Sequence, residues 1–397
     1  MRYREDGRNG NTLSVLGFGC MRFPRTMGSI DQASTTALVA RAVEQGVNYF
    51  DTAYAYSGSE DALGRALADL GVRDKVLIAD KLPHMACKSA GDFERIFATS
   101  LKRLQTDRID YYLIHNVTSA DQWERICQLG VCDWIAKKKQ AGAIGAIGFS
   151  FHGPFPEFEK MLTAYDWDFV QIQYNYVNEH YQAGREGLRM ASERGLPVIV
   201  MEPLLGGKLA DKLPPKARQE LDRVDAQMSP AAWGLRWLWD QPEVTCVLSG
   251  MNAAGQLDDN CAMASAAQAG MLTEGERAAI NAARKAFQEG FRVPCTGCNY
   301  CLPCPKGISI PAAFAAYNES FTLGRVHGIW SYLTGVGAMG AKGDAHFVSD
   351  CVQCGACARK CPQHIDIPAE LQNVRRRLQP AVLPLGVKAY QSLVNRS

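Results

Sequence analysis

The chain has 397 residues and a nearly balanced charge, with 43 Lys and Arg against 41 Asp and Glu. Because this balance comes without a basic tract, it gives no indication of nucleic-acid binding. Hydrophobic residues make up 47% of the chain, which is enough for a sizeable core, and the length suggests two domains or one large domain with an appendage. The opening residues lack a hydrophobic signal region, and no apolar run approaches membrane-spanning length. We therefore expect a cytoplasmic protein without a membrane or nucleic-acid partner.

Strand-like and helix-like runs alternate through the first 250 residues. The predicted strands are 12–22, 47–51, 76–81, 109–115, 143–149, 168–173, 196–201 and 244–248. The predicted helices are 31–44, 59–69, 91–103, 121–140, 154–164, 181–194 and 228–239. Such alternation predicts a parallel sheet, and eight units in about 250 residues is the size of a closed (β/α)8 TIM barrel. An open doubly wound sheet is the alternative, but no G-x-G-x-x-G motif opens any unit.

Three successive predicted strands each bring one ionisable side chain to their carboxyl end. Asp51 ends the first, Lys81 the second and His115 the third, while Tyr56 lies five residues beyond Asp51 in a turn rich in Ser and Gly. In a parallel barrel these groups meet at the rim where active sites are built. Taken singly, each residue is more often a cap, a solvated charge or a structural hydrogen-bonding group. Together they suit acid catalysis.

The chemistry of this combination centres on the phenol. Tyr has an unperturbed pKa of about 10 and is a poor acid at neutral pH. A nearby ammonium lowers that pKa, and a carboxylate holds the ammonium in place. A histidine can then orient a carbonyl or relay the proton. We therefore predict Asp51, Tyr56, Lys81 and His115 as catalytic residues.

In order and context, these four residues match the catalytic tetrad of the aldo-keto reductases, which the chain resembles from about Thr12 to about Phe287. The resemblance implies reduction of a carbonyl, or oxidation of an alcohol, with NAD(P)H as hydride donor and Tyr56 as general acid. It also implies that the loops after the seventh and eighth strands bind the nucleotide, as such barrel loops commonly bind phosphate. The cofactor-binding candidates that follow are Ser150, Gln171, Gly206, Gly207, Lys208, Gly250, Gln256 and Asn260.

The sequence departs from the family pattern in the cofactor cradle. Phe151 follows Ser150 where the family usually has Asn, and Met201 stands where the family usually has an aromatic residue. The eighth loop also lacks a clear pair of basic residues for a ribose 2′-phosphate. The choice between NAD and NADP is therefore open, and flavin mononucleotide (FMN) is an alternative cofactor.

Fourteen cysteines divide into two groups. Six are scattered through the first part, and we expect them to be small buried hydrophobic residues: Cys20, Cys87, Cys127, Cys132, Cys246 and Cys261. The other eight crowd into residues 295–361 as two runs, each ending in Cys-Pro. The second run has the bacterial ferredoxin spacing C-x2-C-x2-C-x3-C-P, and the first run has one residue fewer before its last Cys.

In two-cluster ferredoxins the fourth Cys of each run binds the other cluster. The predicted ligands are therefore Cys295, Cys298, Cys301 and Cys361 for one [4Fe–4S] cluster, and Cys351, Cys354, Cys357 and Cys304 for the second. Zinc is the alternative, because C-x2-C pairs also bind zinc. Two complete runs that both end in Cys-Pro favour iron–sulfur clusters.

These observations predict an aldo-keto reductase-like barrel over residues 1–288 and a ferredoxin-like α+β domain over 289–370. The latter contains an inserted helical segment, 305–350, and a helical tail follows at 371–397. We expect a cytoplasmic oxidoreductase that acts on a small carbonyl or alcohol, with clusters that either are structural or serve a ferredoxin-type redox partner. The alternative is an iron–sulfur electron-transfer protein, with or without flavin, whose barrel couples one-electron donors to a two-electron substrate.

Overall fold

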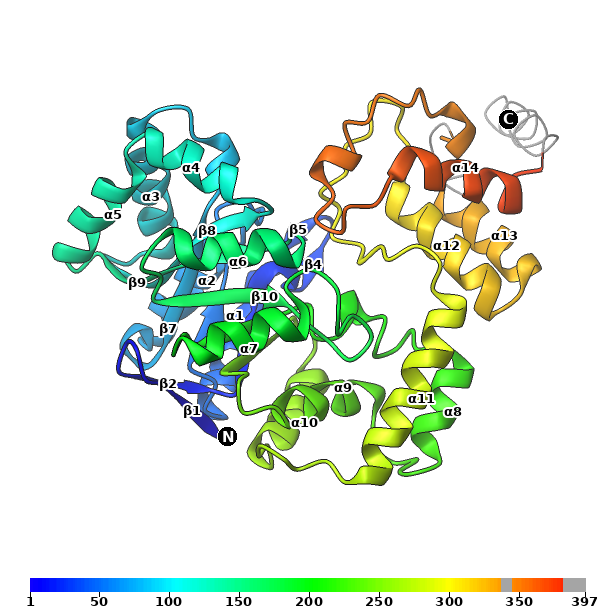
Figure 1. Ribbon diagram of the computed structural model, residues 1–397, viewed down its shortest axis with the longest axis horizontal. Helices are drawn as coiled ribbons and strands as arrows, with labels where there is room; N and C mark the ends of the chain where they lie inside the picture. The colour runs from blue at the N-terminus through cyan, green and yellow to red at the C-terminus, as the bar shows by residue number, and fades with distance from the viewer. Residues whose placement is uncertain (337–344, 381–397) are drawn as a thin grey trace. The chain divides into compact units, whose positions relative to one another are not determined.

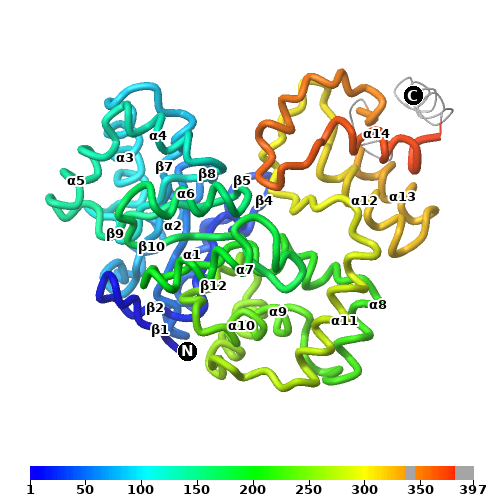
Figure 2. The backbone as a smooth tube through the Cα atoms, viewed as in Figure 1, coloured from blue at the N-terminus to red at the C-terminus, as the bar shows by residue number. Residues whose placement is uncertain are grey.

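A computed structural model describes residues 1–336 and 345–380. Parts of two predicted segments, the insertion 305–350 and the tail 371–397, lie outside the described residues. The chain packs as two compact units, which Figures 1 and 2 show. Unit 1 comprises Met1–Leu204 and Met228–Arg277, and unit 2 comprises Leu205–Gln227 with the chain from Ala278. This division by packing is not a test of the domain boundary predicted at 288/289, which stays a prediction.

Unit 1 is built on a closed barrel of eight parallel strands, which confirms the predicted barrel. Around the barrel the order is β10-β11-β12-β3-β6-β7-β8-β9, so strands close in sequence are also neighbours in the sheet. The strands are β3 (Leu16–Gly19), β6 (Tyr49–Asp51), β7 (Leu77–Leu82), β8 (Ile109–Val117), β9 (Ile144–Phe151), β10 (Phe169–Gln173), β11 (Val198–Met201) and β12 (Cys246–Ser249). Parallel register brings their carboxyl ends to one rim.

The barrel interior is filled with side chains. Tyr49, Tyr111 and Phe169 pack edge to face in it, with ring centroids 5.2 and 5.0 Å apart along the series. Gly17 on β3 is required by this packing, because a Cβ there would lie 2.8 Å from Leu248 and 2.9 Å from the Cys246 sulfur. The interior is therefore a packed core that supports the rim.

The helices of unit 1 mostly follow the predicted alternation. They are α1 (Gln32–Glu44), α2 (Ser59–Leu70), α3 (Ala90–Leu104), α4 (Ala120–Gln128), α5 (Val131–Gln140), α6 (Phe155–Ala164), α7 (Gly184–Glu193), α9 (Pro230–Trp239) and α10 (Ala254–Ser265). The single helix predicted over 121–140 is wrong: the chain breaks it at Gly130, whose φ of 90° is left-handed. Residues 12–22 are also not one strand, because Asn11–Ser14 (β2) pairs with Tyr3–Asp6 (β1) before β3 begins.

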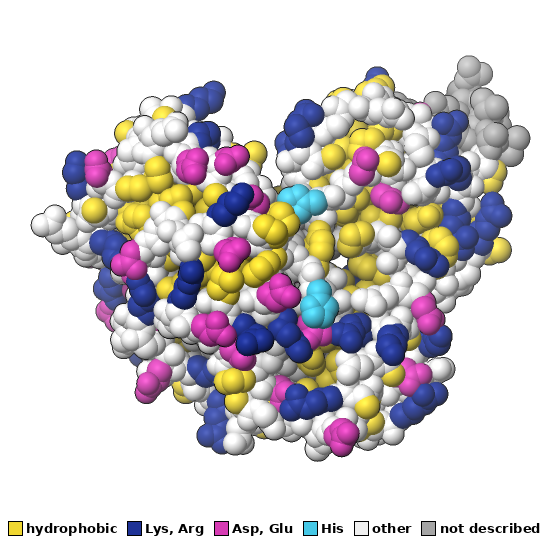
Figure 3. Space-filling view, viewed as in Figure 1, with side chains coloured by type: hydrophobic (Ala, Val, Ile, Leu, Met, Phe, Trp, Pro, Cys, Tyr) yellow, Lys and Arg dark blue, Asp and Glu magenta, His cyan; other side chains and the backbone are white. Residues whose placement is uncertain are grey.

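Short elements complete unit 1. They are the hairpin β4 (Arg25–Thr26) with β5 (Ser29–Ile30), and the 3-10 turns η1 (Cys20–Arg22), η2 (Arg73–Lys75) and η3 (His84–Ala86). Acidic, basic and apolar side chains are interspersed on the face in Figure 3, as the balanced charge predicts.

Unit 2 is helical in its described part. Its elements are η4 (Leu205–Gly207), α8 (Pro215–Asp222), the end of α11 (Glu274–Gly290), α12 (Ile310–Thr322), α13 (Arg325–Gly335), η5 (Val348–Asp350), η6 (Ala358–Lys360) and α14 (Ile367–Leu378). The helices α12, α13 and α14 pack on one another, which Figure 1 shows. Their apolar core includes Phe314, Tyr332, Phe347 and Leu371.

Three consecutive arginines in α14, Arg375 to Arg377, have different surroundings. Arg375 and Arg376 are exposed. Arg377 instead donates to the side chain and carbonyl of Ser320, at 2.5 and 2.8 Å, and its guanidinium lies 3.8 Å from the centroid of the Phe321 ring. Arg377 therefore joins α14 to α12.

Candidate active site and cysteine sites

Lys81 organises the rim of the barrel. It lies on β7 with 1% of its surface exposed, and its Nζ donates to Asp51 Oδ1 at 2.6 Å and to the carbonyl of Thr52 at 2.7 Å. The same Nζ lies 5.0 Å from the centroid of the Tyr56 ring. A buried ammonium with two acceptors and one aromatic neighbour is held in a single place. The carboxylate, the ammonium and the phenol therefore meet as the strand pattern predicts.

His115 joins this group from β8. Its ring lies edge-on to Tyr56, with centroids 5.8 Å apart and planes at 83°. Burial lowers the pKa of His115 well below its usual value, and the charge of Lys81 lowers it further. The imidazole is therefore neutral at neutral pH, with one nitrogen as donor and the other as acceptor.

Asp51 is also buried, at 3% exposure. Burial raises the pKa of its carboxyl, while the charge of Lys81, the bond from Lys81 and the neighbouring Gln171 act in the opposite direction. Lys81 is the cation that compensates this acid, because a buried unpaired carboxylate is costly. Each of the two charges is therefore needed to keep the other buried.

Two further histidines lie near His115 and were missed by the sequence reasoning. His84 in η3 and His152 just after β9 are both buried, and both act on the pKa of His115. The pKa of His84 is lowered to about 4 by burial and by the charge of Arg125. Arg125 on α4 also donates to the carbonyls of His84 and Cys87, at 2.5 and 2.9 Å. Their positions in the sequence could have indicated them, since each histidine closely follows the end of a predicted strand.

Glu202 is a third missed residue at the rim. It directly follows β11, and its backbone is left-handed, with a φ of 53°. Burial raises the pKa of its carboxyl to about 7, and Arg22 opposes that shift. A strained backbone with a perturbed carboxyl is common at functional sites.

The cofactor candidates of unit 1 fall at two places. Gln171 on β10 is 1% exposed, lies beside Asp51, and its Oε1 is a buried acceptor that no described residue satisfies. Ser150 on β9 accepts from the backbone N–H of Asn116, at 2.8 Å, next to His115. These two residues therefore lie near Asp51 and His115, and their role in cofactor binding stays a prediction. The departure at Phe151 has a packing cause, since its buried ring contacts Phe158 with centroids 5.2 Å apart.

The eighth-strand candidates form a separate corner. Gly250 lies against Arg22, Gln256 accepts from the N–H of Asn252 at 3.0 Å, and Asn260 donates to Ser249 Oγ at 3.2 Å. The remaining three candidates, Gly206, Gly207 and Lys208, belong to unit 2, where the two glycines have φ of 66° and 89°. Their role in nucleotide binding stays a prediction.

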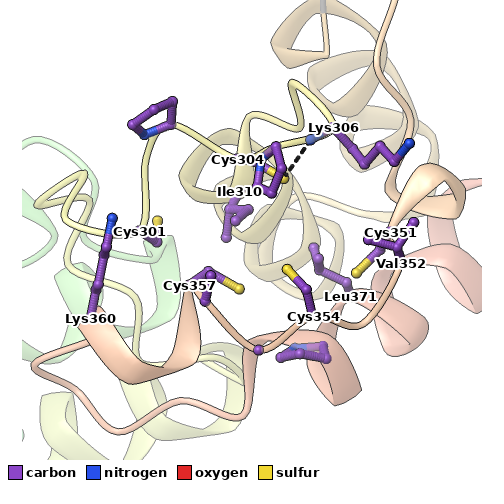
Figure 4. A pocket seen from close by; sticks show the side chains of 15 residues that line it. Cys301, Cys304, Lys306, Ile310, Cys351, Val352, Cys354, Cys357, Lys360 and Leu371 are labelled. Carbon is purple, nitrogen blue, oxygen red and sulfur yellow. Dashed lines mark hydrogen bonds between the residues drawn. The ribbon is translucent and has the colours of Figure 1, made fainter.

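The eight clustered cysteines line two hollows of unit 2. The first, of about 440 Å³, is lined by Cys304, Cys351, Cys354 and Cys357, with Cys301 at its edge. Figure 4 shows these side chains. The second, of about 310 Å³, is lined by Cys295, Cys298, Cys301 and Cys361. Each hollow thus combines three cysteines of one run with the last cysteine of the other, the arrangement that the ferredoxin pattern predicts.

The two cysteine runs repeat one backbone conformation. The residue two after the first Cys is left-handed in both, at Gly297 and Gln353, with φ of 71° and 55°. The residue after the second Cys is left-handed as well, at Asn299 and Gly355, with φ of 67° and 70°. The residue three after the last Cys repeats the pattern at Gly307 and His364, with φ of 69° and 50°, and each precedes a helix by three residues. Left-handed residues are uncommon outside Gly, so their recurrence at matched positions indicates two versions of one binding loop.

Backbone N–H groups also point at sulfurs of the first hollow. Lys306 N–H lies 3.5 Å from Cys304 Sγ, and Gln353 N–H lies 3.4 Å from Cys351 Sγ. Such contacts favour thiolate ligands. The described residues contain no group of three or more His, Cys, Asp or Glu side chains arranged around a single metal ion.

The six scattered cysteines are not all buried. Cys20, Cys87, Cys246 and Cys261 are, as predicted. Cys127 and Cys132 are half-buried at the α4–α5 corner, with their sulfurs 3.2 Å apart. The prediction for these two is therefore wrong, because the break at Gly130 brings both to a surface turn.

No helix in the described residues is long and apolar enough to cross a membrane.

The aldo/keto reductase family model matches residues 15–285, and a model of a 4Fe-4S dicluster domain matches residues 294–366. The uncharacterized oxidoreductase YrpG of Bacillus subtilis is 27% identical over 304 residues, which are 65% of this chain and 90% of that protein. A Schizosaccharomyces pombe protein named aldo-keto reductase yakc [NADP(+)] is 25% identical over 211 residues, covering 50% of this chain and 60% of its own.

A solved structure of an aldo-keto reductase from Bacillus halodurans, in its holo form, shares the fold. Its TM-score is 0.60 at 24% identity, over 71% of this chain and 96% of that one. The family match spans more than half of the chain and covers the three strand-end residues and Tyr56. The chain belongs to the aldo/keto reductase family and continues into a 4Fe-4S dicluster domain.

Proposed function

We propose that the protein reduces a small-molecule carbonyl to an alcohol, or catalyses the reverse oxidation, with Tyr56 as the general acid. The observation that carries this proposal is the position of Lys81, which is bonded to Asp51 at 2.6 Å and lies 5.0 Å from the centre of the Tyr56 ring. A buried cation beside a phenol stabilises the phenolate that remains after proton transfer. Proton donation to a carbonyl oxygen is therefore the chemistry that this arrangement supports best.

Asp51 and Thr52 hold Lys81 in the orientation that this step needs. Their oxygens take two of its three ammonium donors, at 2.6 and 2.7 Å. The third donor is left for the side facing Tyr56. Asp51 is thus a positioning residue, while Lys81 stabilises the charge that develops on the phenol.

His115 orients the substrate oxygen in this proposal. Its pKa is lowered by burial and by Lys81, so it is a neutral donor and does not compete with Tyr56 as the acid. Its ring lies edge-on to that of Tyr56, with centroids 5.8 Å apart, which supports a shared role of the two side chains at one substrate oxygen. Two donors that converge on one oxygen polarise a carbonyl.

A nicotinamide is the hydride donor that fits this site. The buried Gln171 Oε1, unsatisfied among the described residues, suits an amide N–H of the nicotinamide, with Ser150 as the second candidate. When bound, NAD(P)H supplies a hydride to the carbonyl carbon. The relative from Schizosaccharomyces pombe carries NADP+ in its name, which supports a phosphorylated nucleotide. The eight cysteines fit two [4Fe–4S] clusters, because all eight line the two hollows, which hold little else that binds iron.

Replacement of Tyr56 by Phe tests the proposal. General acid catalysis is typically worth about 10²–10⁴-fold, so we expect kcat to fall by that factor on the best substrate of an aldehyde and ketone panel. Nucleotide affinity should change little, because the phenol is proposed to act on the substrate. Tyr54→Phe is the matched control, since Tyr54 lies under Arg103, 4.7 Å from the guanidinium, and outside the tetrad. Wild-type turnover by Tyr56→Phe would show that another group is the acid.

A further inference from the structure

The two cysteine hollows differ in what surrounds their sulfurs. The hollow with Cys295, Cys298, Cys301 and Cys361 is lined otherwise by apolar and uncharged side chains, including Ile310, Phe314 and Gln363. The hollow with Cys304, Cys351, Cys354 and Cys357 is also lined by Lys306 and Lys360. Figure 4 shows these two lysines on opposite sides of the cysteine group. Positive charge therefore gathers at one site only.

The lysine-lined hollow also reaches the surface. Cys354 is the one exposed residue among the eight clustered cysteines, and the others are half-buried. Val352, between Cys351 and Cys354, lines this hollow and is 58% exposed, so an apolar side chain also lies at the surface here. Electron transfer between proteins needs the redox group close to the contact surface. The site that contains Cys354 meets that condition best.

The charged side chains that line this hollow have one sign. Lys306, Lys360 and Arg359 are all exposed, and Arg359 is fixed by a bond to the carbonyl of Cys354 at 3.5 Å. No Asp or Glu lines the hollow. The nearest acid in sequence, Asp350, accepts from the N–H of Phe347 at 2.9 Å, so that its carboxylate is directed to its own turn. A [4Fe–4S] cluster held by four thiolates would be anionic, but the three cations are exposed and would be available to a partner at the surface.

From these observations we infer that Lys306, Val352, Arg359 and Lys360 form the docking surface for a small acidic one-electron carrier protein. We call these four residues the cluster face. The apolar Val352 with a basic rim has the composition of a small transient interface. Complementary charge speeds and orients such encounters without tight binding. The inference rests on the proposed function only in requiring that the clusters are present.

The test uses cluster-loaded full-length protein and flavodoxin as the acidic probe. Flavodoxin hydroquinone is mixed anaerobically with oxidised protein, and the visible band of the flavin semiquinone follows each electron that passes. We expect the second-order rate of the wild type to fall as salt is added, because salt screens exposed charges. In Lys306→Glu/Lys360→Glu, the low-salt rate should fall about tenfold or more. The low-salt rate of the double variant Lys306→Gln/Lys360→Gln should lie between the rates of these two proteins.

Arg325→Glu is the matched control, because Arg325 is exposed at the start of α13 and lines neither hollow. Its rate should stay within about twofold of the wild type, since the interaction of exposed charges is local. Equal rates in the double Glu variant and the wild type, at matched iron content, would overturn this inference and leave the carbonyl reductase proposal standing. So would an equal loss in Arg325→Glu, or a rate without salt dependence. A wild-type preparation without iron would overturn the docking inference and the proposed cluster content together.

Discussion

The barrel rim and the cysteine loops place reactive groups by opposite means. At the rim, Lys81 and Asp51 are almost completely buried, and each is the charge that makes burial of the other tolerable. In unit 2 the eight cysteines are half-buried or exposed, and left-handed residues such as Gly297 and Gln353 shape the loops that present them. The rim is preorganised by packing. The loops take their shape from the backbone, and they gain stability from the group that they bind.

This difference explains which kind of change each region resists. A closed sheet fixes the rim through many strands, so that loss of one side chain there removes a chemical function and leaves the frame in place. The cysteine loops pack against the apolar core of unit 2, but a cluster needs its full set of thiolates, so that loss of one ligand removes the bound group. The following experiments test this contrast.

The largest effect is expected at the rim, in Lys81→Met. We expect kcat to fall by at least about 10²-fold, because the phenol loses the cation that stabilises its charged form. The alkaline limb of the pH–rate profile, on which the phenol loses its proton, should move to higher pH. Lys81→Met/Asp51→Asn controls for the unpaired acid that the single change leaves buried. A double variant that folds and regains activity would contradict the role of Lys81.

The next largest effect is expected in the loops, in Cys304→Ser. The crossed arrangement predicts loss of the cluster held by Cys351, Cys354 and Cys357, and retention of the cluster held by the sequence neighbours of Cys304. Iron should fall by half, from about eight per chain to about four. Electron paramagnetic resonance of the reduced protein identifies the remaining cluster, with Cys127→Ser as a control outside both hollows. Retention of the cluster at Cys351 would show that the ligands do not cross.

A smaller effect concerns the stability of the barrel in acid. The folded pKa of His84, about 4, lies below its unfolded value of about 6.5, so the unfolded chain binds more protons between these two pH values. Stability should therefore fall as the pH drops through this window, by roughly 2 kcal/mol from His84 alone at pH 5. His84→Gln should remove that part of the loss, whereas His327→Gln, at an exposed site of unit 2, should not. Urea unfolding at pH 7 and pH 5 measures both.

In the last experiment, which mixes the protein with NAD(P)H, we expect no change in the cluster absorbance. Iron–sulfur clusters pass single electrons, whereas NAD(P)H gives a hydride, so the two halves need a carrier such as flavin to exchange electrons directly. With NAD(P)H as the donor at the rim, anaerobic mixing with oxidised protein should leave the cluster absorbance unchanged until a mediator is added. Bleaching through a bound flavin would favour the alternative cofactor. Bleaching without any flavin would contradict both assignments.

Much of the site could be predicted because strand ends are readable in a sequence. Asp51, Lys81 and His115 each close an apolar run, and parallel strands bring such positions together whatever the helices between them do. The crossed cysteines were predictable for a similar reason, since short spacing in each run limits which sulfurs can share a group. Each strand end and each cysteine run is a pattern of residues close together in the sequence.

The features that could not be predicted depend on contacts between distant segments. The role of Arg377 requires Ser320 on another helix, and the cluster of histidines requires three strand ends to be placed first. Gly206 and Lys208 follow a barrel strand but pack with unit 2, which no local pattern indicates. Gly130 was visible in the sequence, but an isolated Gly is tolerated in many helices and does not by itself predict a break.

The crossed cysteines also bear on how the chain is made. Synthesis runs from the N-terminus, so the whole barrel sequence has been translated before the last ligands of either cluster site. The site with Cys295 waits for Cys361, and the site with Cys304 waits for Cys357, only four residues earlier. Neither set of four ligands is complete in a chain that stops before residue 357. A complete set of four ligands is thereby reserved for chains that extend to Cys357 or beyond, and a shorter product would not sequester iron in a finished site.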